Sequence, residues 1–139
     1  MGLGSVPGII FTLANSFALF SNITNISLMH VKDDDKDETQ VRLLIVLYLD
    51  AAASLLTLIM AIYSENIIDN DPDSGISTQM VGFMIITIKL LLCVPMIVLM
   101  PMVKEIDDSY YIILLVLSTI ICNVVMFLTY PFAVEENWF

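Results

Sequence analysis

Basic residues are scarce in this sequence: five Lys and Arg stand against fifteen Asp and Glu, which gives a formal net charge of −10. Nucleic-acid binding requires clusters of Lys and Arg that neutralise phosphates, so the sequence predicts no nucleic-acid partner. The same scarcity argues against docking on an anionic lipid surface through a polybasic patch.

Residue types that carry catalysis and metal binding are also scarce. His30 is the one histidine, and the sequence has no Gly-x-Ser-x-Gly elbow and no Gly-Asp pair of the aspartyl membrane protease kind. The acidic stretch 69–80 opens with the Asp-x-Asp-x-Asp spacing of a calcium loop. Its glycine comes one residue late, however, and Met80 stands where such a loop needs Glu. We therefore predict no enzyme, no metal site and no cofactor.

Cysteine is limited to Cys93 and Cys122, and both lie inside apolar segments. A secreted disulfide framework is therefore not expected, and the two thiols are interpreted as small buried hydrophobes. Residues 1–8 contain no positively charged stretch, so no cleavable signal peptide is predicted.

Apolar length is what the sequence has in abundance. Hydrophobic residues make up 58% of the chain and charged residues only 14%, against about 25% charged in soluble domains. Apolar stretches at 6–29, 41–63, 80–102 and 110–134 each match the ~20 residues that a bilayer-spanning helix needs. Because short polar connections join them, we predict an all-α integral membrane protein, with an antiparallel four-helix bundle forming a single transmembrane domain over 1–139.

The first of these stretches is the most polar. Asn15, Asn22 and Asn25 interrupt it, and at 100° per residue they share one face of a helix. This asparagine stripe is predicted to face protein. The alternative is a first helix that lies in the membrane interface.

Two charged residues fall inside the later stretches, which is unusual for spans in contact with lipid. From the rise of an α-helix, Asp50 lies roughly 13 Å, and Lys89 and Asn123 roughly 20 Å, from the same membrane edge. A lysine side chain can span the offset of about 6 Å between Asp50 and Lys89. The hypothesis is an Asp50–Lys89 ion pair in the bundle interior, supported by Asn123 and by Asn15.

Three interpretations of this pair remain open at this point. The pair fixes the register of the helices, or Lys89 snorkels outward while Asp50 meets water or another subunit, or the two residues form a titrating relay for protons or ions. The second stretch also has a narrow face of small and polar residues on the Asp50 side, predicted to pack against other helices: Ala53, Ser54, Thr57 and Ala61.

The few basic residues predict the orientation. Lys32, Lys36, Arg42 and Lys104 all border the first and third connections, so the positive-inside rule places those connections in the cytoplasm and both termini on the non-cytoplasmic side. The sequence leaves open which membrane this is. The glycosylation sequons at Asn22 and Asn25 are expected to stay unmodified.

The function that this pattern favours is a non-catalytic polytopic membrane protein. It is expected to be an accessory or structural subunit of a larger membrane protein complex, with membrane lipids and other transmembrane subunits as its partners. The alternative is an ion or proton channel or carrier that uses the Asp50–Lys89 pair.

Overall fold

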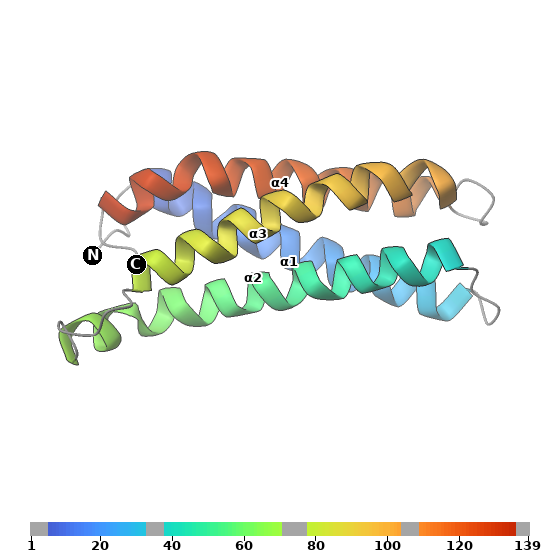
Figure 1. Cartoon of the computed structure of the whole chain (residues 1–139). Coiled ribbons are helices and arrows are strands. Elements are labelled where there is room, and N and C mark those ends of the chain that lie inside the picture. The colour runs from blue at the N-terminus through green and yellow to red at the C-terminus, as the bar shows by residue number, and fades with distance from the viewer. Residues whose placement is uncertain (1–5, 33–37, 71–77, 104–108, 136–139) are drawn as a thin grey trace.

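The computed structural model describes residues 6–32, 38–70, 78–103 and 109–135 of the chain. These residues form four α-helices and a short 3₁₀ helix, with no strand among them: α1 (Val6–Lys32), α2 (Glu38–Asn70), α3 (Thr78–Leu99), η2 (Met100–Val103) and α4 (Ser109–Glu135). Figure 1 shows the four α-helices lying side by side along their length. The rest of the predicted connections, 33–37, 71–77 and 104–108, and the tail 136–139 lie outside the described residues.

Each α-helix contains a segment long and apolar enough to cross a membrane. The segments are Gly8–Met29, Gln40–Met60, Met80–Leu99 and Tyr110–Phe132, with mean hydropathies of 1.3, 2.3, 2.5 and 2.6. They contain 20 to 23 residues, which at the rise of an α-helix is about 30 to 35 Å, comparable with the hydrocarbon core of a bilayer. The first segment also forms a continuous helix, despite its asparagines.

Most helix ends differ from the sequence expectation by one to three residues, and the end of α2 differs by seven. α2 continues to Asn70, beyond the predicted end at 63, because hydropathy marks only the apolar part of a helix and the backbone hydrogen bonds continue into polar sequence. α3 runs through Pro95 but ends at Leu99, where the chain tightens into η2. Pro101 lacks the N–H that a continued α-helix would use, and 3₁₀ turns commonly end helices.

The helices contact one another in a ring. α1 packs on α2, α2 on α3, α3 on α4 and α4 back on α1, and the α1–α4 contact is the most extensive. The first and last helices of the chain are thus direct neighbours, as Figure 1 also shows. The interior of the ring is the place where side chains from all four helices can meet.

The interior has three layers, two of them apolar. The layer that we call the Met96 cluster joins the end of α1 to the starts of α2 and α4 and the end of α3: Ile26, Met29, Leu43, Leu44, Val46, Leu47, Met96, Ile112 and Val116. The Tyr130 cluster lies toward the opposite helix ends: Phe11, Ala14, Ile86, Met126 and Tyr130. Gly82 allows the close approach of Tyr130 there, because a Cβ atom at position 82 would lie 2.7 Å from Tyr130 Oη.

The third layer separates the two apolar clusters. We call it the polar layer, and it consists of six fully or almost fully buried side chains: Asn22, Asp50, Ser54, Lys89, Thr119 and Asn123. By contrast, the outward surface is built of large apolar side chains. Phe20 is 67% exposed, Leu91 63% and Leu128 62%. The charged and amide side chains of the mid-helix region therefore face inward, and large apolar side chains face outward.

Candidate functional site: the polar layer

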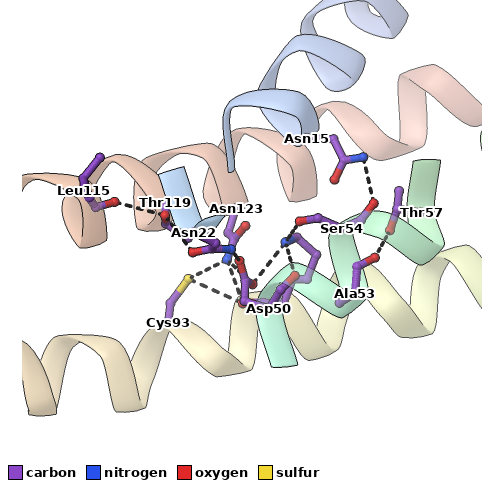
Figure 2. Close-up of polar contacts among 11 residues, drawn as sticks. Asn15, Asn22, Asp50, Ala53, Ser54, Thr57, Cys93, Leu115, Thr119 and Asn123 are labelled. Carbon is purple, nitrogen blue, oxygen red and sulfur yellow. Dashed lines mark hydrogen bonds and ion pairs between the residues drawn. The ribbon is translucent and has the colours of Figure 1, made fainter. Parts of the chain in front are cut away.

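The Asp50 carboxylate lies at the centre of the polar layer, with no exposed surface. Its Oδ1 accepts a hydrogen bond from Asn123 Nδ2 at 2.9 Å and lies 3.1 Å from Lys89 Nζ. Its Oδ2 accepts a 2.6 Å hydrogen bond from Asn22 Nδ2. Since Asn22 is on α1, Lys89 on α3 and Asn123 on α4, each of the other three helices supplies one donor to this carboxylate (Figure 2).

Lys89 is also fully buried, and α2 supplies every partner that its ammonium group has among the described residues. Its Nζ lies against Asp50 Oδ1, donates to the main-chain oxygen of Asp50 at 3.3 Å, and donates to Ser54 Oγ. An ammonium group has three N–H donors. All three therefore have an acceptor, and an ammonium and a carboxylate at this separation offset much of each other's desolvation cost.

The side-chain amides of Asn22 and Asn123 link the helices that form the polar layer. Asn22 donates to Asp50 through Nδ2, and its Oδ1 accepts a hydrogen bond of 3.1 Å from Thr119 Oγ1, so it links α2 to α4 (Figure 2). Asn123 Nδ2 lies within reach of Asp50 Oδ1, of the Lys89 carbonyl at 3.3 Å and of Cys93 Sγ at 3.7 Å. The hydrogen bonds thus form one connected network across the ring.

Asn15 and Asn25 lie just outside the polar layer. Asn15 Nδ2 donates to the main-chain oxygen of Ser54 at 3.1 Å, and Asn25 Nδ2 to that of Ile112 at 3.3 Å. The hydrogen bond of Asn15 to α2 therefore goes to the main chain of Ser54 and to neither the Asp50 carboxylate nor Lys89. The side-chain oxygens of Asn15, Asn25 and Asn123 are buried and have no partner among the described residues.

The small face of α2 lies inside the ring. Ala53, Ser54 and Thr57 are buried, and Thr57 Oγ1 donates to the main-chain oxygen of Ala53 at 2.8 Å (Figure 2). Ala61 belongs to α2, but its side chain is outside the part of the chain that the structure describes. Ser54 is both a small contact residue and a hydrogen-bond partner of Lys89, a second role that sequence reasoning did not assign to it.

The structure brings together Asp50, Lys89 and Asn123 of the predicted cluster, and it puts Asn22 in the place expected for Asn15. Depth along the helix could have indicated this. Asn22 is seven residues from the predicted helix end at Met29, or roughly 11 Å, close to the depth of Asp50. Asn15 is roughly 21 Å from that end. Thr119 was also missed, because a threonine in an apolar helix gives no signal beyond sharing the face of Asn123.

The chemistry available to the polar layer is limited by its enclosure. The Met96 cluster closes it on one side and the Tyr130 cluster on the other. The described residues include no group of three or more His, Cys, Asp or Glu that could hold a metal ion. Cys93 and Cys122 are free thiols. Buried, enclosed and hydrogen-bonded, the layer has the features of a structural network.

Comparisons of the chain with models of known protein families, with curated proteins and with solved structures gave no match.

Proposed function

We propose that this chain is a non-catalytic membrane protein whose four helices cross the bilayer as an antiparallel bundle, and that it is an accessory or structural subunit of a larger membrane complex. The observation that carries the proposal is the position of Asp50. Donors from three helices converge on one carboxylate held by the fourth, so the network defines how the four helices align. A buried polar residue that fixes helix register is a well-attested device.

Insertion in a bilayer is supported by how the outward hydroxyl groups are satisfied. Hydrocarbon offers no hydrogen bonds, so polar groups facing lipid need partners within their own helix. Exposed Ser16 and Ser118 donate to the carbonyls four residues earlier, at Thr12 and Leu114. The remaining outward surface is mostly Leu, Ile, Val, Phe and Met. This is the surface that a lipid environment requires.

The proposed orientation follows from the basic residues. With the connections that carry Lys32, Lys36 and Lys104 in the cytoplasm, both termini lie on the non-cytoplasmic side. The Met96 cluster then occupies the cytoplasmic half. Asn22 and Asn25 have no exposed surface, which supports the expectation that their sequons stay unmodified. A mobility shift on enzymatic deglycosylation would contradict this.

The outer surface is where a protein with a closed interior would act. For this chain that surface faces lipid or other transmembrane helices, which is why partner subunits are proposed. The test is extraction in a mild detergent such as digitonin, followed by native mass measurement and identification of the chains that co-purify. We expect a heteromeric complex well above the mass of the single chain. A particle that contains only this chain would refute the subunit proposal.

The alternative function is an ion or proton channel or carrier, and what favours it is the presence of two ionisable side chains at mid-helix. The two apolar clusters on either side of the polar layer count against a hydrated path. Purified protein in liposomes decides between the two functions. Proton or cation flux that exceeds protein-free liposomes and disappears with Asp50→Asn would replace the subunit proposal, whereas we expect equal, background flux from both chains.

A further inference from the structure

We infer that α1 crosses the membrane only while it is docked on α2 and α4, whereas α2, α3 and α4 keep their transmembrane arrangement without α1. The inference rests on the bilayer arrangement proposed above. The first indication is hydropathy: the apolar segment of α1 has a mean of 1.3, against 2.3 to 2.6 for the other three. A helix that is less apolar partitions less completely into lipid on its own.

The polarity of α1 is concentrated on its buried face. Asn15, Ser21, Asn22 and Asn25 have between 0 and 6% of their surface exposed. If α1 stood alone in a bilayer, these amides would face hydrocarbon without partners, which is strongly unfavourable. The half-buried Thr12 and the exposed Ser16 present no such problem, because they donate to carbonyls of α1 itself.

Among the described residues, every hydrogen-bond partner of the asparagine stripe is on another helix. On α2, Asn15 donates a hydrogen bond to the main-chain oxygen of Ser54 and Asn22 donates one to the Asp50 carboxylate. On α4, Asn25 donates to the main-chain oxygen of Ile112, and Asn22 Oδ1 accepts a hydrogen bond from Thr119 Oγ1. These partners lie between 28 and 97 residues further along the chain. Docking on α2 and α4 therefore supplies what lipid cannot.

The dependence is one-sided. The partners of the Lys89 ammonium group among the described residues are all on α2, and Asp50 keeps Lys89 and Asn123 when Asn22 is taken away. The helices α2, α3 and α4 thus retain their own charge compensation without α1. The three amides of α1 retain no hydrogen bond without α2 and α4. Hence α1 depends on α2 and α4 for its insertion, whereas α2, α3 and α4 do not depend on α1.

The experiment uses the full chain and asks on which side of the membrane three sites lie. Single cysteines are introduced before α1, between α1 and α2, and between α2 and α3, as Ser5→Cys, Asp35→Cys and Ser74→Cys. Each is labelled with a membrane-impermeant maleimide before and after permeabilisation. The parent chain, with its thiols inside α3 and α4, gives the background labelling. A spanning helix has reporters on opposite sides, whichever way the protein is oriented.

Docking is then broken without touching the asparagines. Ala18 in α1 is fully buried, and Ala18→Trp places a large ring where the tightly packed interior has no room for it. The neighbouring Phe17 is 61% exposed, so Phe17→Trp is the matched control. A third variant combines Ala18→Trp with Asn15→Leu, Asn22→Leu and Asn25→Leu. It removes the three amides of α1 but keeps the obstructing ring.

We expect Ala18→Trp to lower the fraction of chains in which α1 spans by about tenfold, since one interhelical hydrogen bond alone shifts such an equilibrium by roughly that factor in favourable cases. The Phe17→Trp chain and the variant with three leucines should keep α1 across the membrane, and α2 should span in every chain. The inference fails if Ala18→Trp leaves α1 spanning, if the three leucines do not restore it, or if α2 is lost as well. If Asp35→Cys and Ser74→Cys, which flank α2, are instead labelled from the same side of the membrane in the otherwise unchanged chain, the bilayer arrangement itself is refuted.

Discussion

The polar layer and the two apolar clusters occupy the same interior but hold the helices in different ways. In water, burial of the Met96 and Tyr130 clusters would drive folding. Between helices that already lie in lipid, this drive is largely lost, because lipid chains are as apolar as the side chains they replace. The clusters then contribute close packing. The polar layer contributes directed contacts that exist in one alignment of the four helices. Close packing and helix register therefore come from separate layers of the interior.

The largest expected effect comes from leaving one charge of the polar layer without its partner. Lys89→Met keeps an unbranched side chain one atom shorter and leaves the Asp50 carboxylate without its counter-charge, which should lower the free energy of unfolding by about 3–5 kcal/mol. Adding Asp50→Asn to Lys89→Met should recover a large part of this loss. Unfolding in mixed detergent micelles, followed by circular dichroism, measures both.

Charge exchange tests the same pair from another direction. Asp50→Lys combined with Lys89→Asp should be tolerated better than either single reversal, because the exchange keeps one charge of each sign in the interior. If the exchanged chain is no more stable than the single variants, Asp50 and Lys89 do not act as partners.

An intermediate effect is expected from the Met96 cluster. Leu47 is fully buried there, and Leu47→Ala should cost about 2 kcal/mol of unfolding free energy, mainly through the cavity it leaves. Leu49 on the same helix is 54% exposed, so Leu49→Ala should change little. A larger loss from Leu47→Ala than from Lys89→Met in the same micelle titration would reverse the ranking of the two layers.

The smallest effect is expected from a single neutral hydrogen bond. The Thr119 hydroxyl lies 3.1 Å from Asn22 Oδ1 and 3.0 Å from the Leu115 carbonyl of its own helix, and Thr119→Val preserves shape but removes this donor. Interhelical bonds of this kind average about 0.6 kcal/mol in membrane proteins. Ser118→Ala is the control, because among the described residues the Ser118 hydroxyl bonds the Leu114 carbonyl of its own helix and no other helix. Equal stability of these two variants would show that the link from α1 to α4 through Thr119 contributes nothing.

Much of the fold could be predicted because lipid-compatible helices have an unmistakable length and composition. The four apolar segments, and the shared buried face of Val116, Thr119 and Asn123, follow from hydropathy and a period of 3.6 residues. The ends of the helices could be predicted less well. α2 continues into polar sequence as far as Asn70, where hydropathy carries no information.

The polar layer could be predicted only in part. Rise per residue placed Asp50, Lys89 and Asn123 at compatible depths, and the structure brings them together. The same arithmetic applied to the asparagine stripe would have selected Asn22 over Asn15. The hydrogen bond between Lys89 and Ser54 could not be predicted from the sequence, because it depends on how far the lysine side chain extends along α2.

The spacing of the Asp50 partners along the chain also has a consequence in time. Lys89 follows Asp50 by 39 residues and Asn123 by 73. At synthesis rates of about 5–20 residues per second, Asp50 is made roughly 2–8 s before Lys89 and roughly 4–15 s before Asn123. During that interval the carboxylate has neither partner. In the bilayer arrangement proposed above, water or a protein-lined site would have to compensate the Asp50 carboxylate in α2 until Lys89 has been made.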